Sequence, residues 1–356
     1  MSDPFIDFVI AAHDPRRRVD RAVASVLAAD STANVRLTLV LHNQPRSAFA
    51  GQIGQYADDS RLRIVEFHDE SRSPAGPFNH GISLASGEYF GIMGSDDFLE
   101  PGALEAWASL ARAHRPDYLM ASLRDQDGAV WREPLLRPGR RRGLDPVRDR
   151  LNYRTAPLGL ISTRFYRDRH LQLTPGFASG EDIEAGLAVI NLGRVDSALG
   201  APSYVVGKDA PERVTHAQRG YGEEIAPLAR LREVEWLAAL PPRRKTAIAV
   251  KLWRLSVVAR VAVRRTESDW PQPDVAALQA FAQWLAEFAP DAVPCLARVE
   301  IQIVRGALSG KRSEILGSIE NYLAAGRSQW LLAGAWWRSL GVDSRLRRIL
   351  RLRLPA

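Results

Sequence analysis

The first 125 residues alternate between short apolar runs and segments whose apolar side chains have helical spacing. The apolar runs cover 5–13, 35–43, 62–68, 88–94 and 117–125. The helical patterns between them cover 19–29, 47–57 and 77–86, and a later one covers 180–193. Near-continuous apolar strands that alternate with helices are typical of a mostly parallel sheet with helices on both faces. The pattern therefore predicts an α/β fold.

From about residue 223 onward the chain is rich in Ala, Leu, Arg and Trp, and its apolar residues keep helical spacing. The clearest helical segments are 224–240, 245–263, 274–288 and 312–326. A chain of 356 residues is also long for a single core. We therefore predict two domains, an α/β domain over 1–220 and an α-helical domain over 221–356.

Polar side chains stand where each of the first four predicted strands ends. They are His13, His42–Asn43, His68–Asp69 and Ser95–Asp97. In open parallel sheets, ligands bind outside the carboxyl ends of the strands. The sequence therefore predicts a ligand crevice along this edge of the sheet.

Composition excludes several classes of protein. Cys295 is the single cysteine, which excludes an internal disulfide framework and a thiolate zinc cluster. A net charge of +7 favours polyanionic ligands, but no nucleic-acid-binding motif is present, so nucleic acid is not an expected partner. Residues 1–15 lack the basic and long apolar regions of a signal peptide, which predicts a cytoplasmic location.

Two adjacent carboxylates, Asp96 and Asp97, come directly after the apolar run 88–94. Paired acids in this position favour a hard divalent cation, which prefers oxygen ligands. They equally favour the N-terminus of a helix, and a helix is expected to begin at Pro101. Both interpretations are open from these residues alone.

Several motifs, taken in their order, resemble the family 2 glycosyltransferases of GT-A fold. They lie in 79–104, 156–168 and 176–193, and the likeness covers roughly 5–215. The resemblance implies an inverting transferase that moves a sugar from a nucleoside diphosphate donor, UDP-sugar by default, to an acceptor hydroxyl. The implied acceptor is a cell-surface glycan, a lipid-linked molecule or a natural product.

The family's Asp-x-Asp motif is altered in this chain. A family pattern of Asp-Ser-Asp-Asp is replaced by Gly94-Ser95-Asp96-Asp97, so the first aspartate is missing. The resemblance implies that Asp96 holds Mg²⁺ or Mn²⁺ against the donor phosphates. Asp97 is then expected to cap the following helix. His216 stands where some members supply a third metal ligand, with a plain surface histidine as the alternative.

The missing aspartate opens a second possibility, a metal-independent transferase. Arginines would then neutralise the leaving group, and the candidates are Arg72 and the run 140–142, with a solvated loop as the alternative for that run. A third possibility is a degenerate, non-catalytic GT-A scaffold that binds a glycan, a membrane surface or a protein partner.

The resemblance also assigns residues to the donor and to catalysis. The implied donor-binding set is Ala11, Ala12, His13, Asn43, Arg72, Asn79, Ser95 and Asp96. Asn43 replaces a family acid that contacts the base or ribose, and its amide can still donate and accept hydrogen bonds. Inverting transfer needs a general base, for which the resemblance implies Asp182, with Glu181 orienting the acceptor or the base. Helix-end acids with a purely structural role are the alternative.

The C-terminal segment 345–354 predicts a basic amphipathic helix. Arg347, Arg348 and Arg351 share one face, opposite apolar residues. Such a helix can lie on an anionic membrane, which would suit a peripheral enzyme at the inner leaflet with a lipid-linked acceptor. Alternatively, it packs on its neighbours or on a second subunit of a homo-oligomer.

Overall fold

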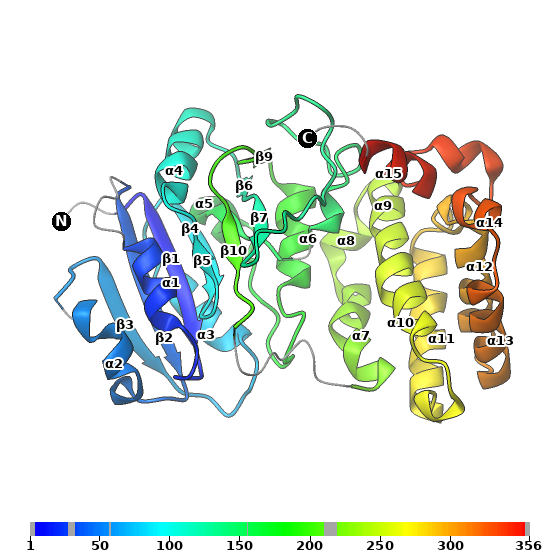
Figure 1. Cartoon of the computed structure of the whole chain (residues 1–356), viewed down its shortest axis with the longest axis horizontal. Helices are drawn as coiled ribbons and strands as arrows, with labels where there is room; N and C mark the ends of the chain where they lie inside the picture. Colours follow the sequence, from blue (N-terminus) through cyan, green and yellow to red (C-terminus); the bar gives the residue numbers. More distant parts are fainter. Residues whose placement is uncertain (1–3, 28–32, 57, 155, 210–218, 353–356) are drawn as a thin grey trace. The chain divides into compact units, whose positions relative to one another are not determined.

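The computed structural model describes residues 4–27, 33–56, 58–154, 156–209 and 219–352 (Figure 1). The chain folds into two compact units. Unit 1 comprises Met1–Trp131, Gly139–Leu144 and Arg154–Ala217. Unit 2 comprises Arg132–Pro138, Asp145–Tyr153 and Gln218–Ala356. The domain boundary that the sequence places after residue 220 stays a prediction.

Unit 1 is built on a seven-stranded sheet. Its strands, in spatial order, are β3 (Leu62–Phe67), β2 (Val35–His42), β1 (Ile6–Ala12), β4 (Tyr89–Gly94), β8 (Gly159–Ser162), β6 (Tyr118–Met120) and β9 (Val195–Ser197). Strand β8 is antiparallel to both of its neighbours, and the other adjacent pairs are parallel. The predicted mostly parallel sheet is therefore confirmed.

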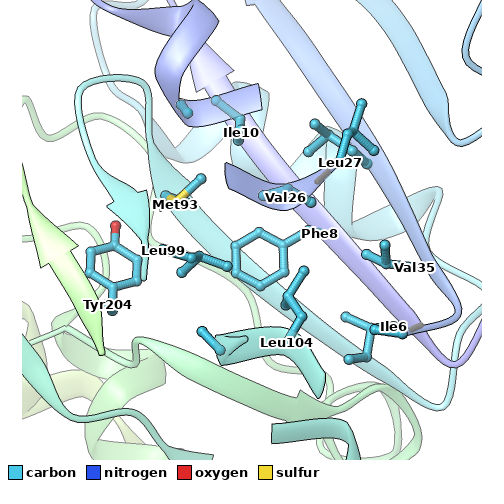
Figure 2. Packing of buried hydrophobic residues seen from close by; sticks show 14 of the residues in the cluster. Ile6, Phe8, Ile10, Val26, Leu27, Val35, Met93, Leu99, Leu104 and Tyr204 are labelled. Atoms are coloured by element: carbon cyan, nitrogen blue, oxygen red, sulfur yellow. The ribbon is translucent and has the colours of Figure 1, made fainter. Parts of the chain in front are cut away.

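Helices cover both faces of this sheet. Side chains alternate between the two faces of a strand, so an apolar strand presents apolar side chains on both faces. Phe8 of β1 packs in the core beneath α1 (Val19–Val26), as Figure 2 shows. The next residue, Val9, points to the opposite face, which is covered by α3 (Ala75–Ser83). There Gly81 lies so close that a Cβ atom on it would be 2.3 Å from Cγ1 of Val9. A side chain at Gly81 would push the helix off the sheet.

A smaller sheet completes unit 1, with the order β5 (Phe98–Leu99), β10 (Tyr204–Val206) and β7 (Leu123–Asp125). The remaining helices of unit 1 are α2 (Ala50–Ile53), α4 (Ala103–His114), α5 (Thr163–Asp168) and α6 (Ile183–Leu192). Strand β10 is antiparallel to β5 and parallel to β7. This pairing places the segment that follows β4 beside the segment around β10.

The structure differs from the predicted elements in two places. The run 117–125 is two strands, β6 and β7, in different sheets. Between them the Ala121 carbonyl accepts a hydrogen bond from Nη2 of Arg154 at 2.6 Å, so a side chain takes the place of a strand partner. The predicted helix 47–57 contains a single α-helical turn, α2, flanked by 3₁₀ turns.

Unit 2 is helical, which confirms the predicted helical C-terminal region. Its α-helices are α7 (Tyr221–Ala229), α8 (Glu235–Ala238), α9 (Pro242–Leu252), α10 (Ala259–Ala262), α11 (Gln272–Phe288), α12 (Arg298–Ser309), α13 (Arg312–Leu323), α14 (Arg327–Leu331) and α15 (Arg345–Leu352). A π-helical turn, Trp253–Val258, interrupts the predicted helix 245–263. Large aromatic side chains fill the core, among them Trp253, Trp270 and Phe281.

Candidate functional site

Asp96 forms an ion pair with an arginine from the neighbouring strand end. Asp96 follows β4, and Arg17 lies in the loop after β1, the strand that pairs with β4. Nη1 of Arg17 donates to Oδ1 of Asp96 at 3.0 Å, and the two side chains are only 11% and 15% exposed. Nη2 of Arg21 also donates to the Asp96 carbonyl at 2.5 Å. Both the side chain and the backbone of Asp96 are thus held by guanidinium groups.

Asp97 was expected to cap the following helix, and this prediction is wrong. Helix α4 begins at Ala103 with Gly102 as its N-cap residue. Asp97 instead accepts hydrogen bonds from the Tyr204 hydroxyl at 2.5 Å and from the Gly207 amide at 2.8 Å. Its carboxylate therefore fixes the segment around β10 beside the end of β4. A helix cap needs its acid next to the helix, and here the strand β5 intervenes.

His13 directly follows β1, the strand that lies between β2 and β4. It is close enough to Arg17, His42 and Asp96 for their charges to act on it. Partial desolvation, and next the Arg17 guanidinium, lower the pKa of His13. The imidazole is therefore neutral at pH 7, and a neutral ring can stack on a nucleobase or hydrogen-bond to it.

Asn43 and its neighbours form a hydrogen-bonded cluster at the end of β2. Nε2 of His42 lies 2.8 Å from Oδ1 of Asp69. Oδ1 of Asn43 accepts from the Asp69 amide at 3.0 Å, and its Nδ2 donates to the Ser71 carbonyl at 3.4 Å. Asn43 has a φ of 56°, a left-handed conformation that asparagine tolerates better than most residues. The cluster fixes the loop after β3 against the end of β2.

Asn79 connects α3 to the segment that leads into α6. Its Nδ2 donates to the Leu173 carbonyl at 2.8 Å, and its Oδ1 accepts from the Leu173 amide at 2.9 Å. Immediately after, the Thr174 amide donates to the Glu181 carbonyl at 2.8 Å. Through these bonds Asn79 positions the residues that carry the second pair of acids. Its predicted contact with the donor stays a prediction.

Glu181 and Asp182 stand at the N-terminus of α6. Asp182 is the N-cap residue, but its side chain makes no capping hydrogen bond. Burial, together with the neighbouring Asp182 carboxylate, raises the pKa of Glu181 to about 7. An acid with a pKa near neutrality can exchange a proton with a hydroxyl group at physiological pH. The raised pKa belongs to Glu181, and the pair is a candidate for proton transfer.

The other predicted site residues lie at different places in the fold. Ala11 and Ala12 end β1, Ser95 is buried between β4 and Asp96, and Arg72 is exposed. The arginine run 140–142 lies along the edge strand β9, where the Arg141 carbonyl accepts from the Ser197 amide at 2.7 Å. Strand β9 is three strands from β4, so this run does not join the first strand ends. His216 is outside the described residues.

The described side chains fit a divalent cation poorly. Within the described ranges, no group of three or more His, Cys, Asp and Glu side chains could hold a metal ion. Asp96 is the carboxylate for which Mg²⁺ or Mn²⁺ is predicted, and its Oδ1 atom is already paired with Arg17. Both oxygens of Asp97 accept protein hydrogen bonds. A cation on this Oδ1 atom would compete with a guanidinium, and the metal stays a prediction.

Sequence reasoning missed the residues that hold the two aspartates. Arg17 belongs to the basic run 16–18, just after the first strand, and nothing in that run points to Asp96. Tyr204 and Gly207 lie more than a hundred residues away, so no local pattern connects them to Asp97. The need for glycine at position 207 becomes visible only in the structure, because a Cβ atom there would lie 1.9 Å from the Asp96 carbonyl oxygen.

The C-terminal helix α15 packs through its arginines. Nε of Arg348 donates to Glu133 at 2.7 Å, and Nη1 of Arg351 donates to the Leu135 carbonyl at 2.8 Å. Arg345 pairs with the buried Glu300 at 2.8 Å. No helix among the described residues is long and apolar enough to cross a bilayer.

Comparison with known proteins identifies a matching family and curated relatives. The model of the family described as glycosyl transferase family 2 matches residues 7–172. The succinoglycan biosynthesis protein ExoU of Rhizobium meliloti (strain 1021) is 34% identical over 98 residues, 27% of this chain and 27% of its own. ExoO of the same organism is 28% identical over 110 residues, 31% of this chain and 30% of its own. The chain thus spans less than a third of the length of these curated relatives.

Solved structures resemble almost the whole chain. S. aureus TarS 1–349 in complex with UDP-GlcNAc has a TM-score of 0.77 at 15% identity, over 89% of this chain and 91% of that chain. The complex of TarS 1–349 with UDP has a TM-score of 0.72 at 14% identity over the same shares. At this level of identity the likeness shows the fold alone, and it confirms the predicted GT-A fold.

Proposed function

We propose that this chain, whose residues 7–172 match the model of glycosyl transferase family 2, transfers a sugar from a nucleoside diphosphate donor to an acceptor hydroxyl. The transfer is a single displacement with inversion at the anomeric carbon. Asp182 takes the proton from the acceptor hydroxyl as it attacks, and Glu181 orients the acceptor or the base. The leaving nucleoside diphosphate lies at the carboxyl ends of β1, β2 and β4.

The carboxylate pair at the start of α6 is the observation that carries this proposal. A pKa of about 7 at Glu181 allows the pair to hold one proton and one negative charge near neutrality. A pair with that charge can accept a proton from a hydroxyl without being fully protonated beforehand. A scaffold that only binds a glycan or a partner gains nothing from two adjacent, partly buried acids, whose mutual repulsion costs stability.

The strand ends support a nucleotide donor. A neutral His13 can stack on a base, and the His42–Asn43–Asp69 cluster offers polar groups beside it. Because TarS is a structural neighbour that was solved with UDP-GlcNAc and with UDP, a UDP-sugar is the first donor to test. A glycan or a lipid-linked molecule of the cell envelope is the proposed acceptor.

Calorimetric titration with UDP, GDP, ADP, CDP and dTDP tests the proposal. One of these diphosphates is expected to bind with a Kd of micromolar order, about −8 kcal/mol. The corresponding nucleoside monophosphate should bind more weakly, because it has lost one phosphate. Absence of binding by the whole panel, with and without Mn²⁺, would contradict the proposed function.

We further propose that unit 2 contacts an anionic membrane from the cytoplasmic side, through the segment before α15. Trp336, Trp337 and Leu340 are 68%, 68% and 67% exposed, although each is large and apolar. At the boundary of a bilayer, a tryptophan side chain places its apolar ring toward the hydrocarbon and its N–H group toward the polar headgroups. Residues 327–352 carry six arginines and one acid, Asp343. Three of these arginines pair with acids outside the segment, Arg338 with Asp291, Arg345 with Glu300 and Arg348 with Glu133. The charge of the other three complements an anionic lipid surface.

Vesicle binding tests this contact. The protein should sediment with vesicles that contain phosphatidylglycerol and much less with pure phosphatidylcholine. Trp336→Ala with Trp337→Ala should weaken binding by at least about tenfold, since each buried side chain contributes about 1.5–3 kcal/mol. Val263→Ala is the matched control, because Val263 is 70% exposed in the same unit and outside the segment. Equal losses in the two variants would contradict the contact.

A further inference from the structure

We propose that Arg17 does the work of a divalent cation in the donor site, so that the diphosphate is bound by a guanidinium and no metal is required. The inference rests on the proposed function, since it concerns the same donor. Arg17 is not one of the arginines that the sequence predicted for a metal-independent site, which were Arg72 and the run 140–142.

The position of Arg17 is the first argument. It lies in the loop after β1 and reaches Asp96 after β4, so it bridges the carboxyl ends of two adjacent parallel strands. Ligands of open α/β sheets bind at such ends. A guanidinium presents its N–H donors in a planar fork, and this fork matches phosphate oxygens.

The charge of the site is the second argument. In the motif that the resemblance implies, two carboxylates and one divalent cation sum to zero. In this chain Gly94 stands in place of one carboxylate, and Arg17 places a positive charge beside Asp96. Asp96 and Arg17 also sum to zero, so the diphosphate meets the same net charge without an ion.

The packing around Asp96 is the third argument. Arg21 donates to the Asp96 carbonyl, pairs with Asp209 at 2.8 Å and stacks over Phe98 at 4.5 Å from the ring centre. These contacts fix the backbone from which Asp96 reaches Arg17. A cation on Oδ1 of Asp96 would compete with a mostly buried, charge-assisted hydrogen bond, which is among the stronger contacts in proteins.

The test is calorimetry with UDP and uridine, in EDTA and in Mn²⁺, or with GDP and guanosine if the panel selects GDP. Wild-type protein should bind the diphosphate equally well, within about threefold, in both conditions. Arg17→Ala should lose about 10- to 100-fold in diphosphate affinity, the size of a charge-assisted hydrogen bond. Its affinity for the nucleoside should be unchanged. Arg16→Ala is the matched control, because Arg16 is the exposed neighbour of Arg17 and pairs with Asp14.

Arg17→Ala should also acquire a response to metal. With the guanidinium gone, Asp96 can take Mn²⁺, so the ion should restore part of the lost affinity in this variant and have little effect in Arg17→Lys. Thermal unfolding of each variant verifies that it is folded. Binding by wild-type protein that rises more than about tenfold with Mn²⁺ would overturn the inference and leave the proposed function intact. This comparison needs no variant. Absence of binding by every diphosphate would instead remove the proposed function.

Discussion

Asp182→Asn is expected to lower turnover by about 10²–10⁴-fold, the usual contribution of a positioned general base. Asparagine keeps the size and the position of the side chain but cannot take a proton from the acceptor. Release of nucleoside diphosphate from the donor selected by calorimetry measures the effect. The affinity for the donor should be unchanged, because the loss falls on the chemical step.

Glu181→Gln should have a different signature, which appears in the pH profile. Because the pKa of Glu181 is raised to about 7, wild-type turnover should rise with pH through an inflection near 7. Below that inflection the pair carries an extra proton and is a weaker base. The glutamine variant lacks the titrating neighbour, so its inflection should move to lower pH and its maximal rate should fall less than that of Asp182→Asn.

The same pKa shift predicts how the stability of the protein changes with pH. Folded protein holds a proton on Glu181 between the ordinary glutamate pKa and about 7, where the unfolded chain has released it. The folded state therefore binds more protons in this window, and the free energy of unfolding falls as pH rises through it. Glu181→Gln should remove this fall, which chemical denaturation at several pH values would measure.

Glu184→Gln is the matched control for both variants. Glu184 is an acid in the first turn of the same helix, and its Oε2 accepts from the Thr174 hydroxyl at 3.3 Å. If the acids only favour the helix N-terminus, all three variants should lose a little stability and keep their activity. Full turnover in Asp182→Asn would contradict the assignment and favour a non-catalytic scaffold.

The sheet was predictable because its signals are local. Each of the first four strands is a mostly apolar run that is followed by polar residues, and the observed strand bounds agree with the predicted ones to within one residue. In a parallel sheet, chain order and direction alone bring such ends to one edge. His13 and Asp96 could therefore be placed near each other before any coordinates were known.

The partners of those residues were not predictable in the same way. Asp97 was assigned to a helix cap from local sequence, whereas its hydrogen bonds come from Tyr204 and Gly207. Residues about 110 positions apart meet only because β10 pairs with β5, a pairing of two-residue length. So short a strand has no periodicity to recognise. Arg17 was overlooked for the related reason that an arginine in a loop is usually solvated.

Glu300→Ala is expected to destabilise unit 2 by about 3–5 kcal/mol, the cost of breaking a buried ion pair. Glu300 is 0% exposed and accepts from Arg254 at 3.1 Å, from Arg345 at 2.9 Å and from the Ala297 amide at 2.6 Å. Alanine would leave two guanidinium groups without their carboxylate, and one of them, Arg254, is almost fully buried. The backbone amide at the start of α12 would also lose its acceptor.

Tryptophan fluorescence during urea unfolding would follow this loss selectively. Two of the nine tryptophans, Trp107 and Trp131, are in unit 1, so the other seven are in unit 2. Glu314→Ala is the matched control, because Glu314 is 51% exposed and pairs with Lys311 at 3.1 Å. An exposed ion pair contributes about 0–1 kcal/mol, so the urea midpoint of Glu314→Ala should be almost the same as that of the wild-type protein. Equal shifts in the two variants would show that the buried charge does not stabilise unit 2. A larger shift of the urea midpoint in Glu300→Ala than in Glu314→Ala is the expected result, because Glu300 holds the guanidinium groups of Arg254 and Arg345 at a buried position.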